Sequence, residues 1–277
     1  MKKILFTSVI LNALFVLPAF ALSISHFTQT EYGFNIQEPG SMNIAPASLD
    51  GKREQLYNFI NFKPGHDEKL VTYIDTPNRD LHKKSLIIRV REDVSKSSKS
   101  KITVKLRAQS PEAFGDLRQY KKAEIDIVGG EKKYSVSWDI KYHPNNIDVR
   151  KVDIAAVLER IKKKNSDAWK VVNARLADAA DKLQQTMVMR ALYWEGPITG
   201  VPGIVEADYS IWSPYYKRPK TAFTSISFKG KSNDSNLPVV AERVATALET
   251  KGIAIPAEKS FSKTRKTFAM SPGFISD

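Results

Sequence analysis

The most constraining feature of this sequence is a set of short segments in which charged and aliphatic residues alternate. Residues 87–91 read Ile-Ile-Arg-Val-Arg, and residues 102–107 read Ile-Thr-Val-Lys-Leu-Arg. Successive side chains of a β-strand point to opposite faces, so each segment would carry cations on one face and aliphatic side chains on the other. The chain is therefore predicted to fold around a sheet with one apolar face and one strongly charged face.

Strand-like segments lie on both sides of a region with helical periodicity. The predicted strands are 70–74, 85–92, 101–108, 122–128, 133–138, 186–194, 204–212 and 222–229. Apolar residues recur at helical spacing over 48–62, over 152–185 with a break near Asn165, and over 237–251. Gly129 and Gly130 mark a tight hairpin between two strands. Strands, then helices, then strands with short connections favour an antiparallel α+β fold in one domain.

The charged face of such a sheet has two interpretations. In a half-exposed sheet the charged face simply contacts water. If the sheet curls on itself, the same face lines a lumen, where converging Arg and Lys side chains would bind a polyphosphate through charge-assisted, often bidentate hydrogen bonds. Carboxylates on that face would then hold a hard divalent cation such as Mg²⁺ or Mn²⁺. Periodicity alone does not separate the two interpretations.

Three motifs occur in the order that a known family shows. Tyr73–Pro77 reads Y-I-D-T-P, Leu86–Arg91 reads L-I-I-R-V-R, and Thr103–Lys105 reads T-V-K. This series resembles the CYTH motifs, in which a Y-x-D-T-P turn precedes an L-x-x-R-x-R strand and a T-x-K strand. CYTH proteins belong to the triphosphate tunnel metalloenzymes, which include class IV adenylate cyclases, thiamine triphosphatases and inorganic triphosphatases. The resemblance extends over residues 36–252.

The resemblance implies an α+β fold, an antiparallel eight-stranded β-tunnel with helices packed outside. It also implies that a ring of basic side chains binds the phosphate groups, namely Arg89, Arg91, Lys105, Arg107, Arg190 and Lys229. Carboxylates in matching positions, Glu124, Glu206 and Asp208, would hold Mg²⁺ or Mn²⁺. The metal would neutralise phosphate charge and polarise phosphoryl oxygens. The implied partner is a phosphorylated small molecule or a polyphosphate.

Two segments depart from the family pattern, and both would supply acidic groups. Family enzymes begin with an E-x-E-x-K strand, whereas residues 37–44 contain Glu38 as their only acidic residue and no lysine. An F-x-E-x-E segment is expected near the last strand, but Phe223–Ser227 carries serine at both acidic positions. A serine hydroxyl does not replace a carboxylate as a hard-metal ligand. The sequence thus predicts phosphate binding, and it leaves open weak metal-dependent triphosphate hydrolysis or a non-catalytic binding or structural role.

Residues 1–21 have the pattern of a signal peptide. Lys2 and Lys3 precede an apolar stretch over residues 4–17, and Ala19 and Ala21 fit a cleavage site after Ala21. The apolar stretch is shorter than the roughly 20 residues that span a bilayer, so no membrane span is expected after cleavage. We predict export to the periplasm or the cell exterior. The rest of the chain divides into an N-terminal segment (22–35), the tunnel domain (36–252) and a basic C-terminal tail (253–277).

Composition narrows the chemistry further. The chain of 277 residues has a formal net charge of +13, which favours anionic partners. It contains no cysteine, which excludes disulfides, thiol catalysis and cysteine-ligated metals. Its four histidines show no metal-ligand spacing, and no P-loop, nucleophile-elbow or dinucleotide motif is present. Aromatic residues such as Trp194 and Trp212 fit core packing better than base stacking, so no nucleic acid partner is expected. The sequence does not fix the oligomeric state.

Overall fold

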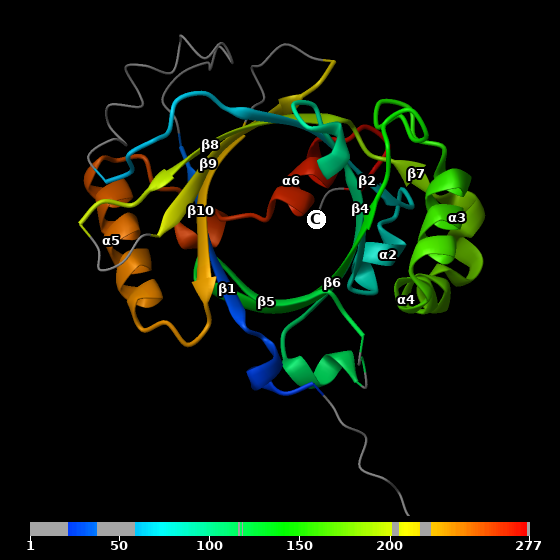
Figure 1. Cartoon of the computed structure of the whole chain (residues 1–277), viewed down its shortest axis with the longest axis horizontal. Coiled ribbons are helices and arrows are strands. Elements are labelled where there is room, and N and C mark those ends of the chain that lie inside the picture. Colours follow the sequence, from blue (N-terminus) through cyan, green and yellow to red (C-terminus); the bar gives the residue numbers. More distant parts are fainter. Residues whose placement is uncertain are drawn as a thin grey trace, which may run out of the picture.

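Among the described residues, nine strands form a closed barrel in the computed structural model (Figure 1). The structure describes residues 22–37, 59–115, 117, 119–200, 205–216 and 223–275. The barrel strands are β1 (Gln29–Ile36), β2 (Asp67–Asp75), β3 (Leu86–Asp93), β4 (Lys101–Ala108), β5 (Lys122–Val128), β6 (Glu131–Lys141), β8 (Met189–Pro197), β9 (Glu206–Pro214) and β10 (Phe223–Lys231). A two-residue strand, β7 (Gln184–Gln185), pairs with one end of β2.

The strand order around the barrel is β3-β4-β6-β5-β1-β10-β9-β8-β2, and the pairing of β2 with β3 closes the ring. The predicted eight-stranded antiparallel tunnel is wrong in two respects, because the barrel has nine strands and is mixed. β1 causes both differences, since it inserts between β5 and β10 and runs parallel to β5. Parallel neighbours need a long connection, and here the chain passes through β2, β3 and β4 between them. The predicted α+β class and the position of helices outside the sheet are confirmed.

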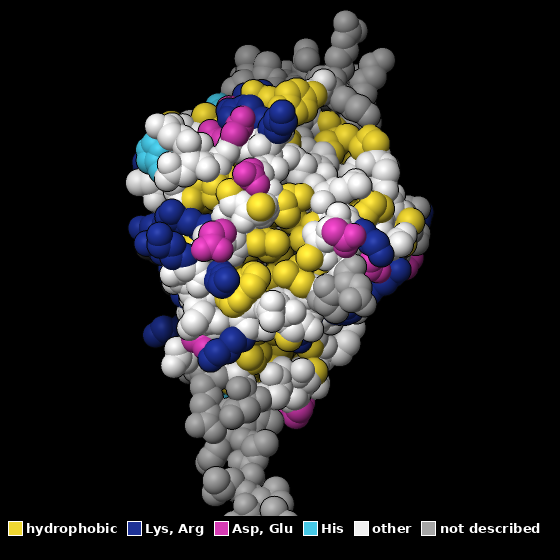
Figure 2. Space-filling model, turned by 90° about the vertical axis from the view of Figure 1, so that its right-hand side faces the viewer, with side chains coloured by type: hydrophobic (Ala, Val, Ile, Leu, Met, Phe, Trp, Pro, Cys, Tyr) yellow, Lys and Arg dark blue, Asp and Glu magenta, His cyan; other side chains and the backbone are white. Residues whose placement is uncertain are grey.

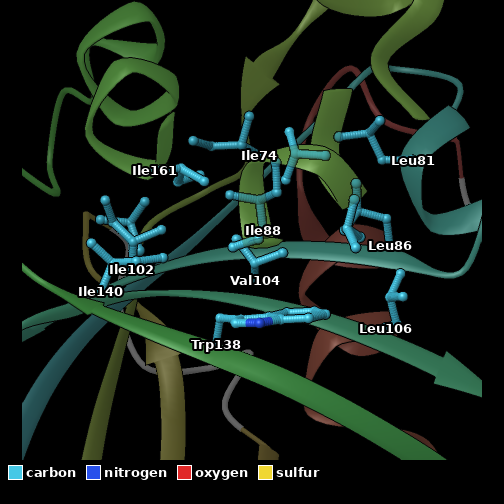
Figure 3. Close-up of a cluster of buried hydrophobic side chains, with 14 of the residues drawn as sticks. Ile74, Leu81, Leu86, Ile88, Ile102, Val104, Leu106, Trp138, Ile140 and Ile161 are labelled. Carbon is cyan, nitrogen blue, oxygen red and sulfur yellow. The ribbon is translucent and has the colours of Figure 1, made fainter. Parts of the chain in front are cut away.

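The outward faces of β3, β4 and β6 are apolar and pack against helices α3 (Ile154–Lys164) and α4 (Ser166–Leu176). Ile88, Val104 and Trp138 of these strands share a buried cluster with Ile161 of α3 (Figure 3). Strand alternation therefore places the charged residues of the same strands on the inward face. Figure 2 shows the side of the molecule that carries α3 and α4, where hydrophobic side chains are visible between charged ones.

A second apolar cluster covers the opposite side of the barrel. Helix α5 (Asn236–Thr250) packs there against the outward faces of β8, β9 and β10 (Figure 1). Trp194 and Ile211 of the strands lie in the same buried cluster as Val240 and Val244 of the helix. Because both clusters occupy the outside of the sheet, the fold leaves the polar faces of the strands to line the interior.

The turn after β2 takes its shape from Asp75, the acidic residue of the Y-I-D-T-P segment. Its buried carboxylate accepts hydrogen bonds from the backbone N–H groups of Thr76 (2.7 Å), Leu81 (2.8 Å) and His82 (2.9 Å). Burial raises the pKa of Asp75, although these three hydrogen bonds act in the opposite direction. The bonds hold the short helix α2 (Asp80–Lys83), from which the chain enters β3. Asp75 therefore has a structural role in this motif.

The C-terminal segment lies across one end of the barrel (Figure 1). Helix α6 (Lys263–Met270) begins after Ser262, whose hydroxyl accepts a hydrogen bond from the N–H of Arg265. Phe268 of this helix is buried in a cluster with Val71 of β2 and Trp212 of β9. Residues that the sequence analysis set apart as a basic tail thus form a helix that packs against the barrel end.

Some predictions concern residues outside the described part of the chain. These are the signal peptide over residues 1–21, the acidic residue Glu38 and most of the predicted helix over 48–62. β1, by contrast, overlaps the predicted N-terminal segment (22–35) and forms a full strand of the barrel. Among the described residues, no helix has the length and apolar character needed to cross a membrane.

Candidate functional site

A cavity of about 270 Å³ lies inside the barrel, lined by inward-facing strand residues and by the start of α6. Its lining is strongly charged, with nine cationic residues against five acidic ones. The cationic residues are Lys69, Arg89, Arg91, Lys101, Lys105, Arg107, Lys122, Lys229 and Lys263, and the acidic residues are Glu31, Glu124, Asp126, Asp139 and Asp208. A concave surface with this excess of positive charge attracts anions.

Most of the predicted site residues meet in this cavity. Five residues that were predicted to bind phosphate line the cavity, namely Arg89 and Arg91 on β3, Lys105 and Arg107 on β4, and Lys229 on β10. The carboxylates of Glu124 on β5 and Asp208 on β9, predicted as metal ligands, line it as well. Alternation explains the placement, because these residues occupy the strand face opposite the aliphatic residues that pack on the helices.

Arg190 and Glu206 lie elsewhere. Arg190 on β8 alternates with Tyr193, which lines the cavity, so its side chain points to the outer face. There it forms a bidentate ion pair with Glu68, with Nε–Oε1 and Nη2–Oε2 distances of 2.9 Å. Glu206 begins β9, and its carboxylate lies 2.5 Å from Nζ of Lys63, with both side chains 54% exposed. Arg190 and Glu206 therefore do not line the cavity with the other predicted site residues.

Arg89 and Arg91 line the cavity without forming an ion pair within the described residues. Arg89 donates from Nη2 to Oγ1 of Thr103 at 3.4 Å. The Nε atoms of both arginines are buried and have no hydrogen-bond partner among the described residues. Burial, together with the neighbouring charge of Arg89, lowers the pKa of Arg91. Buried charges without partners are unfavourable, so an anion that accepts hydrogen bonds from both guanidinium groups would be stabilised here.

Asp126 of β5 forms ion pairs with two of the predicted phosphate-binding residues, Lys105 and Arg107 of β4. Its Oδ2 lies 3.0 Å from Nζ of Lys105 and 2.9 Å from Nη2 of Arg107. Glu124 is farther from the same lysine, at 3.9 Å. Burial alone would raise the pKa of Asp126, but Lys105 and Arg107 lower it to about 2. This part of the cavity therefore carries its own counterion, in contrast to the surroundings of Arg89 and Arg91.

A second buried ion pair joins Lys101 of β4 to Asp139 of β6. Nζ of Lys101 lies 2.6 Å from Oδ2 of Asp139, and Thr103 donates its hydroxyl to Oδ1 at 2.8 Å. Burial raises the pKa of Asp139, but the bonds from Lys101 and Thr103 outweigh it and lower the pKa to about 2. Burial also lowers the pKa of Lys101 to about 8, although Asp139 opposes this change. Both groups are therefore predominantly charged at neutral pH.

This pair predicts a pH dependence of stability. Because the folded pKa of Asp139 lies below the ordinary value of 3.8, its ionised form stabilises the fold above about pH 4. That contribution, about 2 kcal/mol, is lost as the pH falls toward 2, while Lys101 stays charged. The difference in free energy of unfolding between wild type and Asp139→Asn should thus be smaller at pH 3 than at pH 6. Urea denaturation at each pH measures it, and equal differences at pH 6 and pH 3 contradict the prediction.

Several lining residues were missed in the sequence. Glu31 lies on the inward face of β1 together with Gly33 and Asn35. The sequence comparison with the family motifs places the first strand at residues 37–44, but in the structure the first strand is at 29–36. Alternation of Glu31, Gly33 and Asn35 with the apolar Tyr32 and Phe34 is the signal that could have located it. On this face of β1 the cavity is thus lined by one acidic residue, Glu31, together with Gly33 and Asn35.

Lys263 reaches the cavity from α6, and no sequence motif marks it. Its Nζ lies 5.7 Å from the centre of the Tyr193 ring and 5.8 Å from that of Trp212. Burial lowers the pKa of Lys263, whereas the charges of Glu31 and Asp208 act to raise it. Its position depends on how α6 packs on the barrel end, which local sequence patterns do not report.

The carboxylates of the cavity do not fit a Mg²⁺ or Mn²⁺ site. Among the described residues, no three acidic or histidine side chains lie close enough together to hold a metal ion. The predicted ligands are on β5 and β9, and β1 and β10 separate these two strands. A hard divalent cation needs several oxygen ligands, chiefly carboxylates, whereas Asp126 and Asp139 are already ion-paired with protein cations. We therefore derive no chemical step through a metal ion.

Neither a protein-family model nor a curated protein matches the sequence. Among solved structures, the chain is similar to an adenylyl cyclase-like protein from Hippeastrum, described as having a dominant triphosphatase activity. The TM-score is 0.52 at 12% identity, over 89% of this chain and 99% of that chain. The barrel is a CYTH-like tunnel. An adenylate cyclase-like protein from Bacillus halodurans gives a TM-score of 0.45 at 14% identity, over 87% of this chain and 98% of that one. At such identities the likeness concerns the fold of the tunnel alone.

Proposed function

We propose that the tunnel binds a phosphorylated polyanion, either a triphosphate or a polyphosphate. The observation that carries this proposal is the pair formed by Arg89 and Arg91, whose buried Nε atoms have no partner among the described residues. Guanidinium groups bind phosphate oxygens bidentately, and such hydrogen bonds are roughly twice as strong as neutral ones. A bound polyphosphate would supply the acceptors that this pair lacks.

The size and charge of the cavity support a small, highly charged ligand. Its volume of about 270 Å³ is just below the range of roughly 300–1,000 Å³ that is typical of small-molecule sites. The nine cationic residues that line it exceed the acidic ones by four, which suits an anion with several negative charges. A phosphate chain matches this combination better than a large, weakly charged molecule.

Hydrolysis of a triphosphate is a second candidate function. The similar tunnel protein from Hippeastrum is described as a triphosphatase, which favours testing this reaction first. Ser225 and Ser227 face the tunnel where the family resemblance implies carboxylates, which favours the alternative of a non-catalytic binding or structural protein. A screen for released phosphate from tripolyphosphate and ATP, with Mg²⁺ and with Mn²⁺, separates the two. Turnover that Asp208→Ala abolishes would rule out the non-catalytic alternative.

The proposal also includes export of the protein to the periplasm or the cell exterior. It rests on Lys2 and Lys3, the apolar residues 4–17 and the small residues at the cleavage site after Ala21. The mass of the protein recovered from a periplasmic fraction or the culture medium tests it. Loss of residues 1–21 is the expected result, and recovery of the intact chain from the cytoplasm contradicts export.

Isothermal titration calorimetry tests the binding proposal directly. We expect tripolyphosphate to bind at low salt, with an affinity that falls as salt screens the charges. Inorganic sulfate at equal ionic strength is the matched control, because it has fewer charges and cannot span the two arginines and the neighbouring cations. Absence of binding by both tripolyphosphate and ATP at low salt, with or without divalent metal, contradicts the proposal.

A further inference from the structure

The carboxylates of the tunnel all lie near cations that the protein itself supplies. Asp126 is paired with Lys105 and Arg107, and Asp139 is paired with Lys101. Glu124 lies 3.9 Å from Lys105. Of the five acidic residues that line the cavity, Glu31 and Asp208 are the ones without an ion pair within the described residues, and both interact electrostatically with Lys263. This last group differs from the others because one of its cations, Lys263, comes from a helix and not from a barrel strand.

Glu31 and Asp208 face the same sector of the tunnel. In the sheet register, Asp208 of β9 is opposite Ser227 of β10, and Ser227 is opposite Gly33 of β1. Glu31 is the next inward residue beyond Gly33 on that strand. The two acids thus come from strands on either side of β10, at neighbouring levels of the barrel.

Helix α6 delivers Lys263 into this sector. The ammonium group lies over the inward-facing rings of Tyr193 and Trp212, at 5.7 Å and 5.8 Å from their centres. Cation–π attraction of this kind holds a cation in place, more strongly where water is excluded. Phe268 is buried in the apolar cluster at the barrel end, and its packing holds helix α6, which begins at Lys263.

We propose that Lys263 is a fixed cation of the tunnel, placed in the sector where the family resemblance implies a divalent metal ion, and that the tunnel binds its polyanion without a metal. This inference rests on the proposed polyphosphate binding and specifies how that binding is achieved. In its protonated form Lys263 offers three N–H donors, enough to contact a carboxylate and a phosphate oxygen together.

Charge balance in the sector supports this assignment. Lys69 also lines it, with Nζ 4.1 Å from the centre of the Tyr193 ring. Lys69 and Lys263 therefore accompany Glu31 and Asp208, and Lys229 lies opposite Glu31 in the sheet register, so the sector holds several protein cations before any ion enters. A divalent cation that approached Asp208 would be repelled by the nearby charges of Lys263 and Lys69. The phosphate chain instead meets cations that are already in position.

Calorimetry with tripolyphosphate tests the inference, in one buffer that contains EDTA and in another that contains Mn²⁺. We expect the wild-type dissociation constant to agree within about twofold between the two buffers. Lys263→Gln should weaken binding about tenfold or more in EDTA, because a charge-assisted contact is lost. Mn²⁺ should not recover this loss, because the carboxylates of the cavity do not form a site for a divalent cation within the described residues. Lys266→Gln removes the same charge from the same helix outside the cavity lining and should bind as wild type does.

The possible outcomes distinguish this inference from the proposed function. Wild-type binding that requires Mn²⁺ overturns the inference and leaves polyphosphate binding in place. Lys263→Gln that binds as tightly as wild type in EDTA also overturns it. Absence of wild-type binding in both buffers is instead a failure of the proposed function. The wild-type comparison involves no substitution, so it decides the question of metal even if Lys263→Gln does not fold.

Discussion

Replacing Arg89 and Arg91 together by alanine is expected to remove most of the rise in melting temperature that tripolyphosphate gives the wild-type protein. A ligand that binds only the folded state at a hundredfold excess over Kd adds about 2.7 kcal/mol of stability. In a protein of this size that corresponds to a rise of about 5–10 °C. Each lost charge-assisted contact weakens binding by about 1.5–3 kcal/mol, so the double variant should shift by about 1 °C at the same concentration.

The ligand-free proteins provide an additional readout. Arg89 and Arg91 are partly buried with incomplete hydrogen bonding, so their removal should leave the unliganded melting temperature nearly unchanged or slightly raised. Arg190→Ala is the matched control, because it removes an arginine whose side chain points to the outer face, where it pairs with Glu68. This control should keep the full response to tripolyphosphate. A full response in the double variant would instead mean that the two arginines act as ordinary solvated charges.

Sequence patterns predicted the parts of the tunnel in which polarity alone decides the direction of a side chain. On β3 and β4 the aliphatic residues pack outward on α3 and α4, and the alternating cations face inward. The order of strands and helices in the rest of the chain was also readable, because each long segment keeps one period throughout. In these regions the local sequence pattern agrees with the final packing, so the direction predicted for each side chain is the one that the structure shows.

Arg190 shows where this reasoning fails. At the end of the barrel that α6 covers, the inward face is apolar, and Met189 and Ala191 point into it. The rule that charged residues face the tunnel is therefore reversed on this part of β8, and Arg190 points outward. Nothing in the three residues themselves reports the reversal, because it depends on Phe268 of a helix more than seventy residues later in the chain.

The acidic side of the tunnel was the least predictable part for a related reason. Glu31 lies on a strand that joins the barrel through parallel pairing with β5, a contact between distant segments. Lys263 enters from a helix that is only eight residues long and that is held by packing at the barrel end. A local pattern identifies which residues can share a face of one element. It does not identify which separate elements meet.

Replacing Asp126 by asparagine is expected to destabilise the ligand-free protein by about 3–5 kcal/mol at pH 7, because it breaks a buried ion pair from one side. Lys105 and Arg107 both lie within 3.0 Å of its Oδ2, and an uncharged amide oxygen does not balance two cations. Chemical denaturation measures the loss. Asp148→Asn is the matched control, since that carboxylate is 55% exposed and its pair with Arg150 should contribute about 1 kcal/mol or less.

The same substitution should strengthen anion binding while it weakens the fold. Once Asp126 no longer holds them, Lys105 and Arg107 can direct their hydrogen bonds to phosphate oxygens, so tripolyphosphate should bind more tightly to Asp126→Asn than to wild type. Tripolyphosphate should therefore raise the stability of the variant by more than it raises that of wild type, and calorimetry and thermal melts measure both effects. A destabilised variant with unchanged or weaker affinity would mean that Asp126 positions these cations for the ligand rather than competing with it.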